Sequence, residues 1–365
     1  MLWKKGAIGD LSMLGVLSMN MIRPIVRLAR FGSAKYRPVS PHSVIFTVTT
    51  RCNMACRHCG DDVWGDPRND LSLEEIARFS AEMGTLESVA LGGGEPFLRK
   101  DLVEICSLFA VNNQTTAISI PSNGLAPDDI CLKVREILAA CPEVDLIIML
   151  SLDGFQGTHD AIRTEGSFVK VMEAGRKLKS MEAEFPRLSL SFNATISNAN
   201  WKELPALAEF VRDTFQTRLE FNVITGNPRD SDMAIPGRRE LEETIEGLQG
   251  GGERTLLRRL YNKAYRDILV NSNFASRQVI PCRAGSIVCQ IDANGDVRAC
   301  PMMPPFGNLR TASFGEIWHG QEALKQFRSI SNGDCYCNND CFTRISLMYY
   351  WKLPLLMLKK ILKTQ

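Results

Sequence analysis

The feature that most constrains the fold is a regular alternation of strand-like and helix-like segments between residues 43 and 225. Short runs rich in branched and aromatic residues are each followed by a longer stretch with helical periodicity. Several of these runs are apolar on both faces, as expected of parallel strands that helices cover. The six runs are residues 43–50, 87–93, 115–122, 144–151, 187–196 and 218–225.

The intervening helices are expected to begin close to the ends of these runs. Ser72 and Glu75 form a capping-box pattern at the first helix. The later helices are predicted to start near Asp101, Pro127, Ser167 and Trp201. Six βα units in about 185 residues predict an α/β protein with a partial (β/α)6 TIM-like barrel, short of the usual eight units. Such an open barrel leaves a wide lateral mouth for a bulky substrate.

The rest of the chain divides around this core. Residues 226–253 combine Pro, Gly and charged residues and are predicted to be a linker, with a helix after it. The predicted units are a basic apolar N-terminal helical segment (1–40), the barrel core (41–228), a linker and helix (229–278), a small cysteine-rich β-hairpin/helix domain (279–345) and a basic apolar C-terminal helix (346–365).

The stretch TTRCNMACRHCG, residues 49–60, carries Cys52, Cys56 and Cys59 just past the first predicted strand. Catalytic groups of parallel barrels lie on the loops at this end of the strands. Three thiolates on one loop can bind three irons of a [4Fe–4S] cluster and leave the fourth iron open. The alternatives are a zinc site completed by His58 or a remote ligand, and a redox thiol pair.

A second cysteine region spans residues 282–341 and holds six of the twelve cysteines. Asn294-Gly295 between alternating runs predicts a hairpin with a type I′ turn, in which Cys289 lies opposite Cys300. Six thiolates suffice for one all-cysteine four-iron cluster but not for two. A zinc knuckle is the alternative. Cys106, Cys131 and Cys141 lie singly in apolar helical patterns and are expected to pack in the core.

The Cys-x3-Cys-x2-Cys loop at this position resembles that of the radical S-adenosylmethionine (SAM) enzymes. The resemblance implies that the open iron chelates the amino and carboxylate groups of SAM. One electron then cleaves SAM to methionine and a 5′-deoxyadenosyl radical, which abstracts hydrogen from a substrate. It also implies an electron donor such as flavodoxin or ferredoxin.

Further segments resemble the SAM-binding elements of that family. LGGGEPFL (91–98) matches the Gly-Gly-Glu-Pro element at the SAM amino group, and PSNG (121–124) matches the Ser/Thr-Asn-Gly element. SLDGFQGTHDAIR (151–163) resembles the carboxylate-binding segment of the peptide-modifying and sulfatase-maturing branches. Tight βα turns, or an ion pair of Arg163 with Asp160 or Glu165, are the alternatives. The SAM-binding residues implied are Gly93, Gly94, Glu95, Ser122, Asn123, Ser151, Arg163 and Asn193.

Cys282, Gly295 and Cys300 resemble the start of the SPASM and Twitch extensions of the same enzymes, which carry auxiliary [4Fe–4S] clusters. We expect one auxiliary cluster here. The expected ligands are Cys282, Cys300 and Cys341, and Cys335, Cys337 and Cys289 compete for the fourth place. Pro301 stands where the sulfatase maturases carry an Asp base, and no catalytic side chain is assigned.

The substrate predicted first is a ribosomal peptide, and second a lipid-linked or small cyclic metabolite. The second is motivated by the apolar, basic ends of the chain, which are also compatible with peripheral contact of a cytoplasmic enzyme with a membrane. No segment suggests nucleic-acid binding. A rival of another class is a non-catalytic iron–sulfur or zinc protein.

Overall fold

The computed structural model describes residues 40–60, 65–249, 256–350 and 352–362. The predicted N-terminal helical segment falls almost wholly on residues 1–39 and lies outside the described residues.

Six parallel strands form the predicted partial barrel, and the sheet does not close on itself. Its order is β6-β5-β4-β3-β2-β1-β7-β8-β9, so the cysteine-rich region adds three strands to the barrel's first edge. The strands are β1 (Ser43–Thr49), β2 (Ser88–Gly93), β3 (Ala117–Ser122), β4 (Asp145–Ser151), β5 (Leu188–Ile196), β6 (Leu219–Val223), β7 (Val288–Ile291), β8 (Asp296–Arg298) and β9 (Gly307–Asn308).

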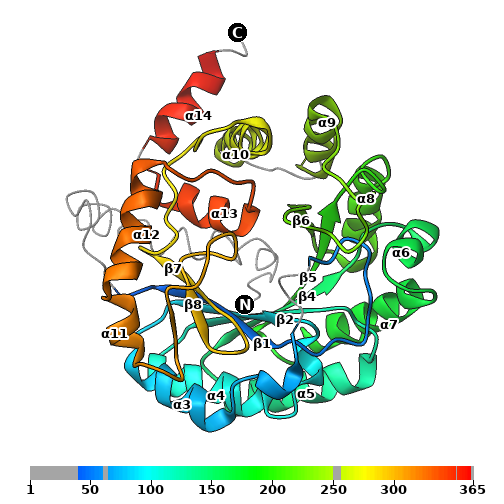
Figure 1. Cartoon of the computed structure of the whole chain (residues 1–365). Helices are drawn as coiled ribbons and strands as arrows, with labels where there is room; N and C mark the ends of the chain where they lie inside the picture. The colour runs from blue at the N-terminus through cyan, green and yellow to red at the C-terminus, as the bar shows by residue number, and fades with distance from the viewer. Residues whose placement is uncertain (1–39, 61–64, 250–255, 351, 363–365) are drawn as a thin grey trace, which may run out of the picture.

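Helices cover the outer face of this curved sheet (Figure 1). The capping box of Ser72 and Glu75 begins the first of them, as predicted. One short helix, α6, was not predicted. The covering helices are α3 (Leu73–Glu82), α4 (Leu102–Asn113), α5 (Pro127–Ala140), α6 (Gln156–Ile162), α7 (Ser167–Met181) and α8 (Leu204–Phe215).

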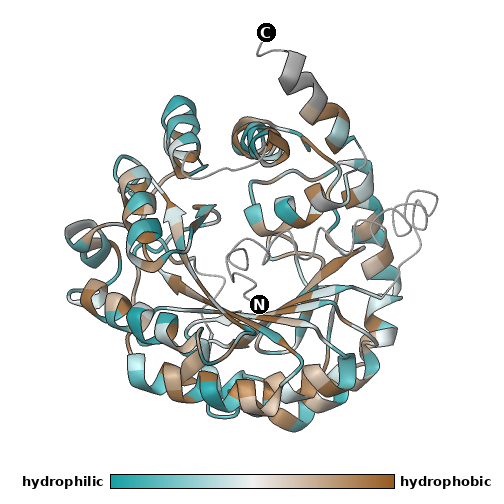
Figure 2. Ribbon diagram, turned by 180° about the vertical axis from the view of Figure 1, so that it is seen from behind, coloured by the Kyte–Doolittle hydropathy of each residue, from teal (hydrophilic) through white to brown (hydrophobic). Residues whose placement is uncertain are grey.

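Each strand buries alternate side chains against these helices, so the core lies between the sheet and the helices. In β1 the buried side chain of Phe46 meets Phe79 of α3 and Phe109 of α4, with ring centroids 5.5 and 6.2 Å apart. Hydrophobic residues accordingly dominate the strands, whereas hydrophilic residues lie on the outward side of the helices (Figure 2). The opposite face of the sheet is half-exposed and faces the barrel interior.

The predicted linker is wrong in part, because residues 238–249 form a helix. Helix α9 (Arg238–Gln249) packs against α8, and α10 (Leu256–Phe274) follows it. The buried residues Leu241 and Ile245 of α9 form an apolar face that packs in the core, although the stretch is polar on the whole. The cysteine-rich part then adds α11 (Phe314–Trp318), α12 (Gln321–Asn332), α13 (Asp340–Met348) and α14 (Leu353–Leu362).

Helices α10 and α13 lie over the free edge of β6, where the barrel is open (Figure 1). Arg344 of α13 donates to the backbone carbonyl of Phe221 and pairs with Glu220 at 2.9 Å and with Asp340 at 3.0 Å. Asn338 donates to the carbonyl of Ile224. These side chains satisfy backbone acceptors that an unpaired strand edge would otherwise expose.

The hairpin is present, but the predicted turn and register are wrong. Gln290 pairs with Arg298 and Ile291 with Val297, and the N–H of Asp292 donates to the carbonyl of Asp296 at 2.9 Å. The loop therefore has three residues, 293–295, and Gly295 takes the left-handed conformation (φ 90°). A three-residue loop that ends in a left-handed glycine is a common alternative to the two-residue turn. The shift by one residue removes the predicted facing of Cys289 and Cys300. Cys289 instead lies beside Val44 of β1, fully buried.

Among the described helices, none is both long enough and apolar enough to cross a bilayer. The C-terminal helix α14 packs against α10, with Leu353 and Leu356 against the core.

Candidate active site and cysteine clusters

The first cysteine loop follows β1 at the carboxyl end of the parallel strands. Cys56 is buried and Cys52 is exposed, and the backbone N–H of Cys59 donates to the carbonyl of Cys56 in a tight turn. Burial raises the pKa of Cys56, and the neighbouring Cys59 and Cys52 thiols raise it further. The three thiols therefore lie on one short, turned segment of the chain.

Backbone contacts from distant segments fix this loop. Arg57 N–H donates to the carbonyl of Ile162 after β4, and Arg229 N–H donates to the carbonyl of Cys59 after β6, both at 2.9 Å. Asp230 N–H donates to the carbonyl of Arg57, and the side chains of these two residues form an ion pair of 2.6 Å. The loop is thus held in place before any cofactor binds.

The glycine-rich turn after β2 packs directly on the cysteine loop. Gly94 N–H donates to the carbonyl of Thr49 and Glu95 N–H to that of Arg51, both at 2.9 Å. Gly93 has φ of 134°, which favours glycine. A Cβ on Gly94 would lie 2.4 Å from the carbonyl oxygen of Arg51. The two glycines are required here because backbone meets backbone.

Glu95 ties this turn to the end of β3. Its carboxylate accepts from the hydroxyl of Ser122 at 3.0 Å and from the N–H of Asn123 at 2.7 Å. The Asn123 amide in turn donates to Asn53 on the cysteine loop at 2.7 Å. Burial raises the pKa of Glu95 to about 6, against the lowering effect of these donors. The residues predicted from two separate motifs therefore form one network, and Asn53 is a member that the sequence analysis missed.

Arg163 does not pair with Asp160 or Glu165, the partners considered in the sequence. Its Nε donates to Asp153 at 2.6 Å, and its Nη1 lies 3.7 Å from the sulfur of Cys56. Asp153 is fully buried and was not singled out, although it stands in the SLDG segment directly after β4. A carboxylate at the end of a barrel strand is the signal that could have found it.

Two predicted residues share one row across the inner face of the sheet. Ser151 of β4 is the register partner of Asn193 of β5, which is the partner of Glu220 of β6. Asn193 also accepts a long hydrogen bond of 3.4 Å from Asn222. Ser122 and Asn123 follow on from the end of β3, whereas Asn193 lies three residues before the end of β5, so the predicted SAM-binding residues come from consecutive strands.

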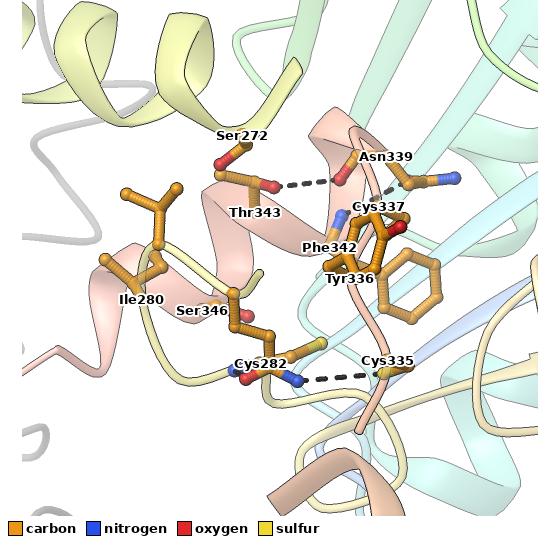
Figure 3. Close-up of a pocket in the computed structure, with 12 residues that line it drawn as sticks. Ser272, Ile280, Cys282, Cys335, Tyr336, Cys337, Asn339, Phe342, Thr343 and Ser346 are labelled. Atoms are coloured by element: carbon orange, nitrogen blue, oxygen red, sulfur yellow. Dashed lines mark hydrogen bonds between the residues drawn. The ribbon is translucent and has the colours of Figure 1, made fainter. Parts of the chain in front are cut away.

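Four cysteines of the second region surround one cavity. Cys282 and Cys300 line it with Cys335 and Cys337, although these residues are up to 55 positions apart. Burial raises the pKa of Cys282 to about 11 and that of Cys300 to about 12, and the thiols of Cys335 and Cys337 contribute to both. Figure 3 shows Cys282, Cys335 and Cys337 around the adjoining pocket.

Gln278 joins the two segments of this cavity, and the sequence analysis missed it. Its side-chain carbonyl accepts from the N–H of Cys282 at 3.2 Å. Its amide donates to the carbonyl of Ile330 at 2.8 Å and lies 3.6 Å from the sulfur of Cys335. One side chain therefore fixes both sides of the site.

Two cysteines of the region lie away from this cavity. Cys341, one of the three expected ligands, sits on α13 and lines neither of the two adjoining pockets. Its side chain is exposed, and the charged groups beside it are Asp340 and Arg344 rather than other cysteines. Cys289 is enclosed between β1 and other core residues.

Both donor sets consist of free thiols, which suit iron–sulfur clusters. Thiolates on a cluster lie farther apart than those on a single ion because iron and sulfide atoms separate them, and they are its normal protein ligands. His58 faces Asp153 at 3.7 Å rather than completing a zinc site with the cysteines.

The comparisons with known proteins agree with this geometry. A family model of the radical SAM superfamily matches residues 46–211, and one of an iron–sulfur cluster-binding domain, SPASM, matches residues 282–342. The chain belongs to the radical SAM superfamily. It is an enzyme whose cofactors are a [4Fe–4S] cluster and SAM, together with auxiliary iron–sulfur binding in the SPASM domain.

The relatives of this radical SAM enzyme act in different reactions. It is 29% identical over 331 residues to the mycofactocin maturase MftC of Mycolicibacterium smegmatis, covering 87% of this chain and 80% of that protein. It is 24% identical over 309 residues to the AdoMet-dependent heme synthase of Methanosarcina barkeri, covering 79% and 85%.

A solved structure has the same fold. The chain matches Streptococcus suis SuiB bound to the precursor peptide SuiA with a TM-score of 0.57 and 14% identity, over 85% of this chain and 71% of that one. This likeness confirms the predicted fold, a partial parallel barrel followed by a cysteine-rich extension.

Proposed function

We propose that Cys52, Cys56 and Cys59 hold the [4Fe–4S] cluster of this radical SAM enzyme and leave one iron for SAM. When bound, the cluster supplies the electron that cleaves SAM to methionine and a 5′-deoxyadenosyl radical. The observation that carries the proposal is the convergence of three thiols on one loop, which backbone contacts hold between the ends of β2, β4 and β6.

The SAM molecule would lie along the carboxyl ends of β2 to β5. The backbone of Gly93 and Gly94 can approach its amino group, and Glu95 orients that turn. The Ser151 hydroxyl and the Asn193 amide on the following strands can hydrogen-bond its carboxylate and ribose. Ser122 and Asn123 would support the site through their hydrogen bonds to Glu95 and Asn53.

The auxiliary cluster would be held by Cys282, Cys300, Cys335 and Cys337. Four thiolates complete the coordination of a four-iron cluster, so this one has no site for SAM. Gln278 would orient Cys282 and Cys335. This set replaces Cys341 with the pair Cys335 and Cys337.

A peptide is the proposed substrate. The half-exposed positions on β5 and β6 carry only short hydroxyls, amides and one carboxylate, which suit a polar chain better than a lipid tail. They are Ser189, Ser191, Asn193, Thr195, Glu220 and Asn222. The precursor peptide bound to SuiB supports the same class.

The test is anaerobic reconstitution with iron and sulfide, followed by dithionite and SAM. We expect 5′-deoxyadenosine and methionine, and an altered product mass for a short peptide encoded beside the enzyme's gene. A fully loaded protein that releases no 5′-deoxyadenosine would contradict the proposal and favour a non-catalytic iron–sulfur protein.

Two partners belong to the proposal as well. Flavodoxin or ferredoxin would replace dithionite as the electron donor, which a turnover assay with either protein measures. Peripheral membrane contact through the chain ends is tested by liposome flotation of the full chain and of a variant without residues 346–365. If neither the full chain nor the truncated variant floats with the liposomes, a lipid-linked substrate loses its support.

A further inference from the structure

Arg163 is built into the support of the first cysteine loop. Its side chain is 7% exposed, although an arginine usually keeps its charged end in water. Nε donates to the Asp153 carboxylate at 2.6 Å, and Nη1 lies 3.7 Å from the sulfur of Cys56. The guanidinium therefore bridges a buried anion and a thiol of the loop.

Asp153 is itself held rigidly. Its second carboxylate oxygen accepts from the N–H of Thr195 at 2.7 Å, and its backbone carbonyl accepts from the amide of Asn200 at 2.8 Å. Asn200 also donates to the carbonyl of Thr195. A carboxylate fixed from the end of β5 thus sets where the guanidinium can point.

Arg163 keeps its positive charge in this environment, because a guanidinium stays protonated in proteins and the buried Asp153 carboxylate beside it compensates the charge. A thiolate that binds iron carries more negative charge than a thiol, so the attraction to Arg163 persists in the loaded protein.

We propose that Arg163 is a positioning residue of the cluster, held by Asp153 to donate to the sulfur of Cys56 and to raise the cluster's reduction potential. This rests on the proposed cysteine ligands. Hydrogen bonds to the sulfurs and local net charge are two of the factors that set the potential of iron–sulfur clusters. Arg163 is then not the residue that binds the SAM carboxylate, which leaves that role to Ser151 and its neighbours.

The test is an EPR-monitored redox titration of the reconstituted enzyme without SAM. The relevant signal is the one that changes when SAM is added, which separates it from the auxiliary cluster. Arg163→Gln removes both the charge and the donor to Cys56, and we expect a more negative midpoint potential. Arg163→Lys keeps the charge without the guanidinium fork, so its shift should be smaller.

Asp153→Asn supplies a change of opposite sign. It keeps the guanidinium but removes the compensating negative charge, so we expect a less negative potential. A purely structural role would not move the potential in opposite directions in two variants of one ion pair. If Arg163→Gln does not take up its cluster, the midpoint potentials of Asp153→Asn and Arg163→Lys still test the proposal.

Arg57→Gln is the matched control. Arg57 is on the same loop and loses the same charge, but its side chain is 44% exposed and pairs with Asp230 at the surface. Solvent screens such a charge, so we expect a much smaller shift than in Arg163→Gln.

SAM affinity, measured by titration of the same EPR signal, separates the two roles of Arg163. We expect Arg163→Gln to weaken SAM binding by less than about threefold. Loss of a charge-assisted hydrogen bond to the carboxylate would weaken it about tenfold or more. Tenfold weaker SAM binding with an unchanged potential would overturn this inference and leave the proposed function intact. A signal that does not respond to SAM even in the wild-type enzyme would instead refute the proposed function.

Discussion

The two cysteine regions reach their geometry by different routes. Cys52, Cys56 and Cys59 occupy eight consecutive residues of one loop, so their proximity follows from the chain itself. Cys282, Cys300, Cys335 and Cys337 come from three segments that only the folded structure brings to one cavity. The first set has three thiols and the second has four. A site that must admit a cofactor is built locally with an open position, whereas a closed site can be assembled from distant parts.

Removal of a loop cysteine should have the largest effect. Cys52→Ala, Cys56→Ala or Cys59→Ala deprives one iron of its ligand, so we expect complete loss of 5′-deoxyadenosine formation in the anaerobic dithionite assay. Cys300→Ala should retain part of this activity, because SAM binds at the other cluster. Equal losses in the two sets would break the comparison.

The choice of auxiliary ligands is tested by iron content. Cys337→Ala should lower the reconstituted iron from about eight to about four atoms per chain, since a four-thiolate site loses a ligand. Cys341→Ala is the control four residues away and should keep the full content. Full iron in Cys337→Ala together with loss in Cys341→Ala would restore the ligand set expected from the sequence.

The assembly of the second region on the barrel depends on Arg344. Arg344→Met leaves buried Asp340 and the half-buried Glu220 without their cation, so the free energy of unfolding should fall by about 3–5 kcal/mol in urea titrations. Arg212→Met breaks only an exposed pair with Asp213 and should cost less than about 1 kcal/mol. Similar decreases in the free energy of unfolding of both variants would mean that Arg344 does not hold the second cysteine region against β6.

The smallest predicted effect concerns His159 of α6, whose Nδ1 accepts from the backbone N–H of Asp153 at 3.1 Å. Burial lowers the pKa of His159 to about 4, although Asp153 and Asp160 oppose the shift. The unfolded chain then binds this proton at higher pH than the folded one. Stability from neutral His159 is therefore complete above about pH 6.5 and is lost as the pH falls toward 4.

His159→Asn should remove this pH dependence. The stability advantage of the wild type over the variant should shrink by up to about 2 kcal/mol between pH 7.5 and pH 5, measured by urea unfolding at each pH. The exposed His319→Asn is the matched control and should follow the wild type at every pH. A constant difference between wild type and His159→Asn would contradict a buried neutral imidazole.

Prediction from the sequence succeeded where the signal is local. Short apolar runs that alternate with helical patterns give the six strands, and the capping box of Ser72 and Glu75 gives a helix start, because these patterns depend on neighbours in the chain. It failed at the hairpin, because Asn294-Gly295 is compatible with turns of two and of three residues. The packing of Cys289 beside β1 accompanies the longer loop.

By itself the sequence determined the parallel barrel and the open three-cysteine loop, because periodicity and spacing are properties of adjacent residues. Only the tertiary structure decided that Arg163 points at Cys56 and that Cys335 and Cys337, rather than Cys341, face Cys282. Those choices depend on which buried charge or thiol lies within reach after folding. Burial enforces these arrangements, because an unpaired charge in the interior costs far more folding free energy than one at the surface.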